Sequence, residues 1–430
     1  MDTGLGKATS RGTVTLIAPT RIIKEPVETH RIDGIEIVFQ LTPETEAPAE
    51  MHMFHPGLRA LNLAENATHN LHNIYPIRGA QARDANAWAK YLNEALDRFG
   101  PHADVAFAQH HWPVWGNARV RDFLGRQRDL YKYLHDQTAR LMNHGYKAAE
   151  IAERLALPKS LSATWHVRGY YGTLSHNAKS VYQRYIGWYD ANPANLNPLP
   201  PVERGRKYVE YMGGADAAIG RAREDFARGE YRFVAEAMSH VVFADPANTE
   251  ARQLGADALE QMGYAAESAT WRNAYLLGAL ELRQGVPGAV ARAPVSPDVV
   301  RAMSLDLFFD YLGVRINGEK AEGRHIVVNW VFSDLDRSYV ANLEHSALTY
   351  LADRRSERAD ATVTLERAAL NRLVLRDVAF ADAVEHGLVR VEGNADKVAE
   401  LFALLDDFYL MFEVVEPKRE SRAAPGRPGS

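Results

Sequence analysis

The sequence predicts a multidomain α+β protein, and three observations lead to that prediction. The 430 residues correspond to about three domains at roughly 150 residues each. Short apolar runs separated by turn residues fill Gly12–Trp115, whereas apolar residues recur at helical spacing from Val120 onward. Beyond Asp298, alternating strand-like segments return between helical ones. We therefore expect a layered α/β part, an all-helical part and an α+β part, in that order.

The first part is defined by short apolar runs with a helix among them. Phe99 ends a helical pattern that begins near Ala87. The strand-like runs are Val14–Ile17, Ile35–Leu41, Met51–Phe54, Leu61–Leu63 and Val105–Ala108. This interleaving predicts an α/β sandwich or a layered sheet.

The middle part reads as helices. Apolar residues at helical spacing begin at Val120 and stop at Gly145, and a second helical pattern ends at Pro158. Later helices are expected at Tyr231–Phe243 and Thr249–Met262, with a third after them, and the Pro/Asn cluster Asn192–Pro201 separates the two groups. The small residues Ala235, Ala251, Ala256 and Ala258 resemble those of tetratricopeptide pairs, and we interpret them as packing residues.

The last part follows a Pro/Gly-rich linker at Gly285–Pro297. Its expected elements are a helix at Asp298–Leu312, strands at His325–Phe332, Ser338–Leu343 and Ala361–Leu365, and two final helices. Asn394 is the expected N-cap of the last helix, which runs to Phe408. The tail from Lys418 onward is rich in basic residues, Pro and Gly and is expected to be disordered.

Composition excludes several classes of site. The net charge is 50 − 55 = −5, which gives no electrostatic reason to expect a nucleic-acid partner. The chain has no cysteine, so it cannot form a disulfide framework, a thiolate zinc site, an iron–sulfur cluster or a cysteine nucleophile. No apolar stretch approaches the roughly 18 residues of a membrane span. Any metal must bind to His, Asp and Glu.

Histidines and glutamates are dense in one region of the first part. The region contains Glu44, Glu46, Glu50, His52, His55, Glu65, His69, His72, His102, His110 and His111. Ligands at strand ends and in the following loops can converge from distant positions in the chain. Spacing alone leaves two interpretations open, which are a metal site and ordinary loop polarity with backbone capping.

Five residues in this region stand out. Glu65 follows an apolar strand-like run, and the pair His110-His111 follows another, so both places are strand ends. His69 and His72 lie three residues apart, a spacing that can put both on one helical face and suit two ligands.

A set of motifs resembles the linear alkyl sulfatases of the metallo-β-lactamase superfamily. The motifs are Ala49–Met53 (AEMHM), Leu61–Asn73 (LNLAENATHNLHN), Arg78–Ala80 (RGA), Ala108–Gly116 (AQHHWPVWG), Arg168–Thr173 (RGYYGT) and Tyr182–Asp190 (YQRYIGWYD). The resemblance runs to about Glu416. It implies part of a metallo-β-lactamase αβ/βα sandwich at 1–119, an all-helical dimerisation domain at 120–284, a linker at 285–297, an α+β sterol-carrier-protein-like domain at 298–416 and a disordered tail at 417–430.

The same resemblance implies roles for individual residues. Glu46, Glu65 and His110 match the family's zinc ligands, with Glu65 bridging two ions and Glu50 as the competing choice for the first position. The sulfate-binding turn falls on 73–78, with Asn73 and Arg78 as contacts. A guanidinium fork matches the oxygens of an anion. A tyrosine of the helical part also contacts sulfate in the family, and Tyr182 is the best match, followed by Tyr171.

The function implied by the resemblance is zinc-dependent hydrolysis of linear alkyl sulfate esters, of the dodecyl sulfate type, to an alcohol and sulfate. In such detergent-degrading hydrolases two zinc ions activate a bridging water, and metals and Arg78 stabilise charge on the departing sulfate. The resemblance further implies a homodimer through the helical part and a C-terminal domain that shelters the alkyl chain. Which ester bond breaks does not follow from the motifs.

One family motif is absent, because no HxHxDH sequence occurs in the chain. We therefore expect the chain to begin partway through its catalytic domain and to carry three of seven zinc ligands. The expectation has three versions, namely a longer gene product with Met1 as an internal start, a second chain that supplies the rest, or a non-catalytic remnant. The alternative function is thus a dimeric module that binds hydrophobic ligands. The address is cytoplasmic as written, and periplasmic or secreted if an upstream signal is missing.

Overall fold

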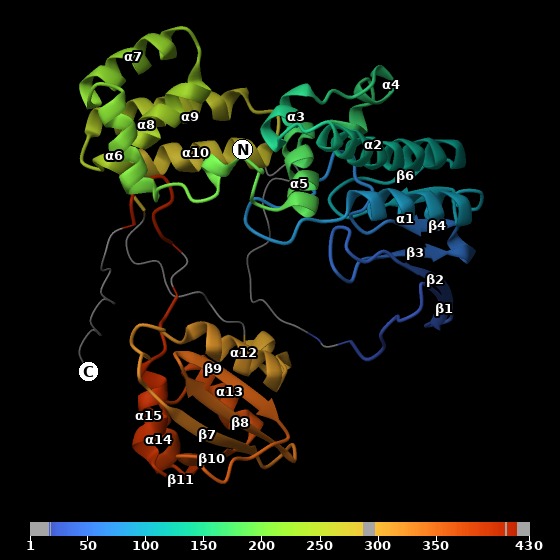
Figure 1. Ribbon diagram of the computed structural model, residues 1–430. Helices are drawn as coiled ribbons and strands as arrows, with labels where there is room; N and C mark the ends of the chain where they lie inside the picture. Colours follow the sequence, from blue (N-terminus) through green and yellow to red (C-terminus); the bar gives the residue numbers. More distant parts are fainter. Residues whose placement is uncertain (1–16, 18, 287–296, 409–410, 419–430) are drawn as a thin grey trace. The chain divides into compact units, whose positions relative to one another are not determined.

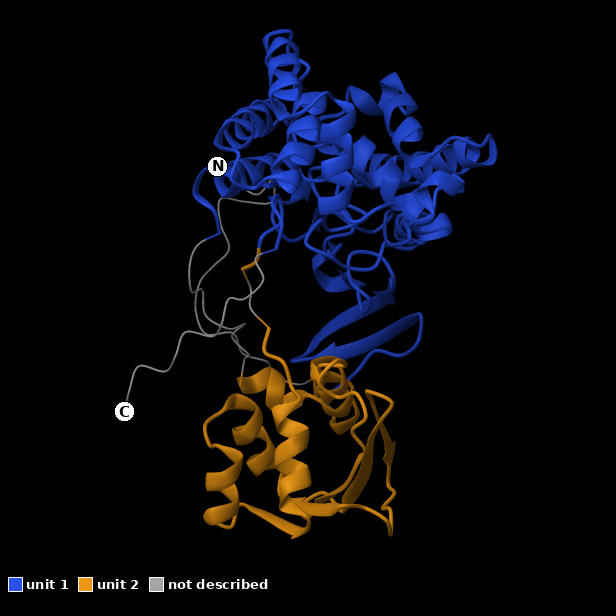
Figure 2. Ribbon diagram, turned by 60° about the vertical axis from the view of Figure 1, so that its left-hand side comes forward, with its two compact units in different colours: residues 1–10, 21–286, 413–430 blue, residues 11–20, 287–412 orange. Residues whose placement is uncertain are grey.

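A computed structural model gives the fold and describes residues 17, 19–286, 297–408 and 411–418. It is a mixed α+β structure, drawn in Figure 1, which confirms the predicted fold class. The described chain divides into two compact units, coloured separately in Figure 2. The first unit contains 21–286 and 413–418, and the second contains 297–408 with residues 17, 19, 20, 411 and 412. The five-part boundaries predicted from the sequence stay a prediction.

Parts of three predicted segments lie outside the described residues. They are positions 14–16 of the strand expected at Val14–Ile17, positions 287–296 of the linker, and positions 419–430 of the tail. Ile17 itself is exposed and belongs to no strand.

A six-stranded sheet begins the first unit. Its strands are β1 (Val27–Ile32), β2 (Ile35–Leu41), β3 (Met51–His55), β4 (Ala60–Asn62), β5 (Val105–Phe107) and β6 (Val114–Trp115), paired in sequence order. Only β4 and β5 run parallel among these pairs. Four of the strands agree with the sequence prediction, which missed β1 and β6. The hairpin signal for β1 is present in the chain, because Asp33 and Gly34 both have positive φ (48° and 80°), as a type I′ turn requires.

Two long helices cover one face of this sheet (Figure 1). They are α1 (Ala85–Arg98) and α2 (Asn117–Asn143). Asp84 caps α1 by accepting hydrogen bonds from the Asn86 and Ala87 amides. The apolar stripe of each helix packs on the strands, and the shared core includes Phe54, Leu61, Trp88, Leu92, Phe123 and Leu130. The packed core that the sheet shares with α1 and α2 is therefore built largely from strands and helices that the sequence predicts.

His52 is a fully buried histidine on β3 whose tautomer is set by its neighbours. The Asn66 side-chain amide lies 3.0 Å from His52 Nε2, and Gln40 Oε1 lies 3.2 Å from Nδ1. Gln40 is oriented by its own amide, which donates to the Tyr91 carbonyl. Asn66 Nδ2 can only donate and Gln40 Oε1 can only accept, so the imidazole is neutral with its proton on Nδ1. Burial lowers the pKa of His52 to about 3.

We expect acid to destabilise the fold through His52. Its pKa in the folded state lies below the unfolded value of 6.5, so the stabilisation is complete above pH 6.5 and is lost as pH falls toward 3. The slope approaches about 1.4 kcal/mol per pH unit. Urea unfolding at about pH 7.5 and about pH 5.5 measures it. His52→Gln should lose part of this slope, whereas His102→Gln, at an exposed position, should keep it. Equal slopes in both variants would exclude His52 as the cause.

The rest of the first unit is helical. Its helices are α3 (Ala148–Arg154), α4 (Lys159–Ser162), α5 (Leu174–Ile186), α6 (Pro201–Tyr211), α7 (Ala215–Ala227), α8 (Tyr231–Ala244), α9 (Thr249–Ala265) and α10 (Ala269–Gln284). The helices α6–α10 build a second core. Ala251, Ala256 and Ala258 are fully buried in it, in agreement with their interpretation as packing residues.

The second unit is an α+β layer structure. A five-stranded sheet has the order β11-β10-β7-β8-β9, in which only β7 and β10 are parallel neighbours. The elements are α11 (Pro297–Ala302), α12 (Leu305–Arg315), β7 (Ile326–Phe332), β8 (Arg337–Glu344), β9 (Ala347–Ala352), β10 (Ala361–Leu365), α13 (Arg367–Leu375), α14 (Phe380–Glu385), β11 (Val389–Gly393) and α15 (Ala395–Ala403).

Two helix predictions in this unit are wrong in their bounds. The helix expected at Asp298–Leu312 is two helices, because Ser304 accepts a hydrogen bond from the Leu307 amide and begins α12 anew. The last helix is capped by Asn394 as predicted but ends at Ala403, not Phe408. Leu405 forms a bridge with Ile316, and the Asp406 amide donates to the Arg315 carbonyl (2.8 Å), so tertiary pairing replaces the last helical turn.

Candidate functional site

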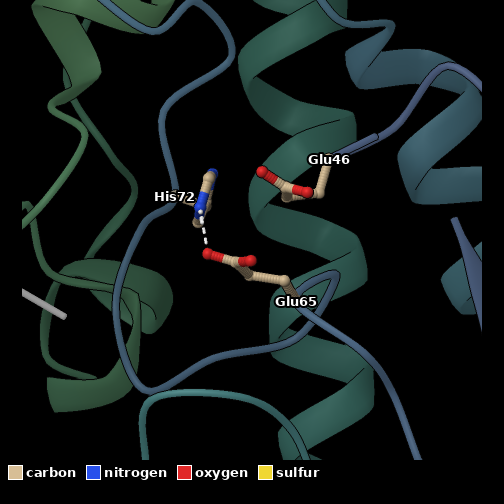
Figure 3. A group of neighbouring side chains, drawn as sticks. All are labelled: Glu46, Glu65 and His72. Atoms are coloured by element: carbon tan, nitrogen blue, oxygen red, sulfur yellow. Dashed lines mark hydrogen bonds and ion pairs between the residues drawn. The ribbon is translucent and has the colours of Figure 1, made fainter. Parts of the chain in front are cut away.

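Two carboxylates and an imidazole meet beside the six-stranded sheet. Glu46, Glu65 and His72 each offer a ligand atom, and these atoms lie within 4.8 Å of one another (Figure 3). Glu65 Oε1 lies 3.1 Å from His72 Nε2 and 3.1 Å from His110 Nε2. The side chain of His72 is 1% exposed and that of Glu65 is 17% exposed. Of the three residues predicted as metal ligands, Glu46 and Glu65 lie in one group with His72, and His110 lies against Glu65.

Adjacent parallel strands bring Glu65 and His110 together. The Leu63 amide, just after β4, donates to the Phe107 carbonyl at the end of β5 (2.8 Å), and the Gln109 amide donates to the Ala64 carbonyl (3.1 Å). Both chains then turn with a positive φ, 49° at Ala64 and 77° at His110. Such backbone costs on the order of 1–3 kcal/mol and gathers at functional sites.

Glu46 comes from the loop between β2 and β3, which is closed on itself. The Thr42 amide donates to the Glu50 carbonyl (2.8 Å), and the Thr45 hydroxyl donates to the Thr42 carbonyl (2.5 Å). The Asp84 amide donates to the Glu44 carbonyl (2.9 Å), which ties the loop to the start of α1. The carboxylate of Glu46 is therefore carried by a short, fixed loop.

Crowding of negative charge marks this group. Burial, then the charge of Glu46, raises the pKa of Glu50 to about 7, and Glu65 adds to the effect. Glu50, the competing ligand in the sequence prediction, is thus a neighbour of Glu46 and Glu65. Burial also raises the pKa of Glu65, but the hydrogen bond with His72 and the charges of His72, His110 and Arg83 outweigh it and lower the net value.

The donor set fits a divalent transition metal. Carboxylate oxygen and imidazole nitrogen are the ligands that zinc accepts when no thiolate is present, and the chain has no cysteine. Glu65 Oε1 faces two imidazole nitrogens at hydrogen-bond distance, and a cation among these atoms would relieve the crowding of carboxylates described above. The residues present are therefore suited to hold a metal ion.

The predicted anion-binding turn lies directly beside this group. Asn73 is buried next to His72, and Arg78 is exposed at the far end of the turn. Among the residues that the structure describes, no hydrogen bond or ion pair engages the Arg78 guanidinium. Arg78 lies close enough to Arg83 for its charge to contribute, after burial, to the lowered pKa of Arg83. An exposed guanidinium next to a buried one suits an anion.

Helix α5 holds the turn in place. The Asn177 side chain donates to the His72 carbonyl (2.8 Å) and accepts from the Ile74 amide (2.8 Å), so it clamps the backbone on both sides of Asn73. The Trp271 indole donates to His176 Nδ1 (3.1 Å), and His176 Nε2 lies 2.5 Å from the Tyr75 carbonyl. An indole N–H only donates, so Nδ1 accepts and Nε2 carries the proton to Tyr75.

The two tyrosines proposed for sulfate lie differently. The ring of Tyr171 packs on His72 with centroids 4.8 Å apart, which places it at the site. Tyr182 lies on α5 and is nearly buried, and burial followed by the charge of Asp190 raises its pKa. No contact described for Tyr182 joins it to Asn73 or Arg78. Its role stays a prediction.

His69 is turned away from the group, against expectation. The described segment between β4 and α1 contains no helix, so His69 and His72 do not share a helical face. The ring of His69 instead packs within 5.5 Å of those of His111, Trp112, Phe123 and Trp165. His72 does lie in the group, but the predicted helical face shared with His69 is wrong.

Arg83 is the residue that the sequence analysis missed entirely. Its guanidinium reaches Glu46, Asn73 and His72, and its side chain is 9% exposed. No motif contains it, and its partners lie 10 to 37 positions away. The only available signal is its place immediately before Asp84, the N-cap of α1.

Comparison with known proteins places these residues in a family. Residues 147–285 match the model "Alkyl sulfatase dimerisation", and residues 293–417 match "Alkyl sulfatase C-terminal". The chain is 54% identical, over 97% of its length, to an alkyl/aryl-sulfatase of Saccharomyces cerevisiae, of which it covers 64%. It is 31% identical, over 92% of its length, to a linear primary-alkylsulfatase of a Pseudomonas strain, of which it covers 75%. The chain belongs to the alkyl sulfatase family.

A solved structure also places this chain in the alkyl sulfatase family. The stereoselective inverting sec-alkylsulfatase Pisa1 from Pseudomonas sp. superimposes with a TM-score of 0.93 at 44% identity, covering 97% of this chain and 66% of that one. The family resemblance inferred from the motifs is confirmed. The chain spans 62–64% of the length of the three curated relatives that match it at 45% identity or more.

The described part of the chain offers no candidate for a membrane-crossing helix, because none of its helices combines the required length and apolarity.

Proposed function

We propose that this chain acts in the zinc-dependent hydrolysis of linear alkyl sulfate esters, of the dodecyl sulfate type, to an alcohol and sulfate. The observation that carries the proposal is the meeting of Glu46, Glu65, His72 and His110 beside the turn that bears Asn73 and Arg78. A group able to hold metal thus lies next to a group able to hold an anion. Relatives named alkylsulfatases support the choice of substrate class.

Each residue has a role in this proposal. Glu46, Glu65 and His110 would help to hold the two zinc ions, as three of the seven ligands that the resemblance implies. When bound, zinc would lower the pKa of a water and polarise the ester oxygens. The Arg78 guanidinium receives sulfate oxygens. Asn73 accepts the Arg83 hydrogen bond with its amide oxygen, so its amide N–H groups remain for a sulfate oxygen.

The remaining parts of the proposal concern partners. The match of 147–285 to a dimerisation model supports a homodimer through the helical region. The second unit, matched as the C-terminal part of alkyl sulfatases, would shelter the alkyl chain of the substrate.

Sulfate release from dodecyl sulfate tests the function. Release of sulfate by the purified chain, measured by ion chromatography, together with about two zinc ions bound per chain by metal analysis, would support the proposal. Removal of zinc by a chelator should stop the release, and added zinc should restore it. An intact dimer with neither zinc uptake nor sulfate release would refute the proposal and favour a non-catalytic binder of hydrophobic ligands.

Arg78→Ala is expected to weaken substrate binding and leave the metal in place. Loss of a charged hydrogen-bond donor to an anion costs about 1.5–3 kcal/mol, so KM for dodecyl sulfate should rise roughly 10- to 150-fold. Zinc content should stay unchanged, because no described contact joins Arg78 to Glu46 or Glu65. Arg121→Ala, at an exposed arginine on α2, is the matched control and should alter neither quantity. Zinc loss in Arg78→Ala would contradict the assigned role.

A further inference from the structure

The chain leaves the second unit and returns to the first. Residues 413–418, which we call the strap, follow the second unit in the sequence but belong to the first. The strap lies against the last turn of α10, the helix that precedes the second unit in the chain (Figure 1). Both connections of the second unit to the first are therefore anchored at the same end of one helix.

Glu281 on α10 holds the backbone of the strap. The Val414 and Val415 amides donate to the same oxygen, Glu281 Oε1, at 2.7 and 3.0 Å. A carboxylate in the last turn of a helix is unfavourable by itself, because the helix dipole is negative at that end. Two backbone N–H donors offset this cost, and hydrogen bonds to a charged acceptor are roughly twice as strong as neutral ones. Glu281 is thus suited to bind an extended segment by its backbone.

Arg252 on α9 holds a side chain of the strap. Its Nη1 donates to Glu416 Oε2 at 2.7 Å, and its Nε donates to the Leu282 carbonyl at 2.9 Å. Both charged side chains are largely buried, because 16% of Arg252 and 3% of Glu416 are exposed. One guanidinium therefore satisfies a carbonyl at the end of α10 and pairs with the strap at the same place.

A glycine of α10 leaves room for an apolar side chain between these two contacts. Val415 packs against the core of α6–α10, and a Cβ atom at Gly278 would already lie 3.4 Å from Val415 Cγ1. Val414, by contrast, is 65% exposed. The end of α10 therefore recognises two backbone amides, one branched apolar side chain and one carboxylate, all within residues 414–416.

The balance of these contacts favours a strap that opens and closes. Removing two charges from water offsets most of their attraction, so a buried ion pair contributes little net stability. Of the strap residues, only Val415 packs against the core of α6–α10. The second unit has a sheet and a core of its own. Opening of the strap is therefore a local event that leaves both cores folded.

We propose that the strap is a reversible latch on the second unit. When it is docked at the end of α10, the second unit is tethered at both of its ends. When it is released, the second unit keeps one connection to the first. The proposal goes beyond the function proposed above and does not depend on sulfate ester chemistry.

Binding of the strap in trans tests the docking site. A dye-labelled peptide with the sequence of 411–418 (MFEVVEPK) is titrated, by fluorescence anisotropy and up to millimolar concentration, into the full chain carrying Val415→Asp and Glu416→Gln. The strap of this variant should no longer dock, so the peptide should bind and saturate. Wild type should bind it at least about 10-fold more weakly, because a tethered segment competes at a millimolar effective concentration. No binding to the variant, or equal binding to both chains, would overturn the proposal.

The motion of the second unit tests the tether. The chain has no cysteine, so Leu351→Cys, at a 63% exposed position on β9, takes a single dye. We expect the slow rotational correlation time of the dye to become at least about 2-fold shorter when Val415→Asp and Glu416→Gln are added, because a unit of roughly a quarter of the chain tumbles faster than the whole. An unchanged correlation time would show that the strap does not restrain the second unit.

Variants on the docking side keep these outcomes distinct. Arg252→Met should release the strap and, unlike the strap variant, should also fail to bind the peptide. Glu281→Ala makes the same test if the Arg252→Met chain does not fold, as judged by circular dichroism and the unfolding midpoint. Peptide binding by a folded docking-side variant as tight as that of the strap variant would contradict the assigned contacts.

Glu260→Gln is the matched control on α9. The Glu260 carboxylate pairs with Arg283 of α10 and accepts from the Tyr264 hydroxyl, and no described contact joins it to the strap. This variant should keep the wild-type correlation time and the weak peptide binding of wild type. Release of the strap by Glu260→Gln would mean that any disturbance of the α9–α10 pair opens it. Sulfate release enters neither measurement, so failure of the proposed function leaves both tests decisive.

Discussion

Glu65→Ala is expected to abolish zinc binding and, with it, any release of sulfate. Its Oε1 atom is the point at which His72 Nε2 and His110 Nε2 both meet a carboxylate at 3.1 Å. Without Glu65 the two imidazoles lose their common acceptor, and Glu46 alone cannot bring a second carboxylate to the group. We expect zinc affinity to fall by more than about 100-fold, beyond the 10- to 100-fold typical of groups that only support a ligand. Metal analysis after gel filtration measures the loss.

Glu44→Ala is the matched control for this variant. Glu44 lies in the same loop as Glu46, but its side chain is 65% exposed and pairs with Arg184. Exposed pairs contribute about 0–1 kcal/mol, so this variant should keep nearly all of its zinc. Comparable zinc loss in Glu65→Ala and Glu44→Ala would mean that Glu65 acts only through the fold.

Gly172→Ala is expected to destabilise the first unit strongly, although it adds only one methyl group. A Cβ atom at Gly172 would lie 2.7 Å from the His72 carbonyl oxygen and 2.8 Å from the Asn73 amide nitrogen. Neither backbone can retreat, because the Gly172 amide donates to the Leu71 carbonyl (2.8 Å) and Asn177 clamps the other side. Overpacking of this kind costs about 1–3 kcal/mol and occasionally more, so we expect a loss of about 3 kcal/mol and a Tm lower by roughly 6–12 °C.

Gly125→Ala provides the opposite expectation with the same chemical change. Gly125 lies inside α2, and a Cβ there would meet nothing within 4 Å. Alanine is the better helix former by about 1 kcal/mol, so this variant should be as stable as wild type or slightly more so. Calorimetry of both variants checks the pair. If Gly172→Ala unfolds at the same temperature as Gly125→Ala, the close approach of the two backbones is incorrect.

Most strands and helices that carry the site could be predicted from the sequence, whereas most side-chain contacts within the site could not. Glu65 and His110 were predicted as ligands from the family resemblance, and both follow apolar runs whose ends are brought together by adjacent parallel strands. In the first sheet, the strands that escaped prediction, β1 and β6, are a polar edge strand and a two-residue strand. Neither of these two has the alternation on which the period-two signal depends. In the second sheet, β9 and β11 were also missed.

The contacts of Arg83 and Tyr171 show why the remainder could not be predicted. Arg83 reaches Glu46 across 37 positions, and Tyr171 reaches His72 across an even longer interval. Contacts of this kind arise from turns whose conformation is set by tertiary hydrogen bonds, such as those of Asn177 on both sides of Asn73. The local pattern of apolar and polar residues in the sequence does not predict such contacts.

The clamp that Asn177 forms has a consequence for how such chains can be recombined. The Asn73 turn precedes α2 in the sequence, yet its backbone is satisfied by a helix that lies about a hundred positions later. A chimera whose helical part carries no amide side chain at position 177 would keep both architectures and still leave the His72 carbonyl and the Ile74 amide without their partner. In such a chimera, therefore, the Asn73 turn and α5 should be taken from the same relative, whichever relative supplies the flanking strands.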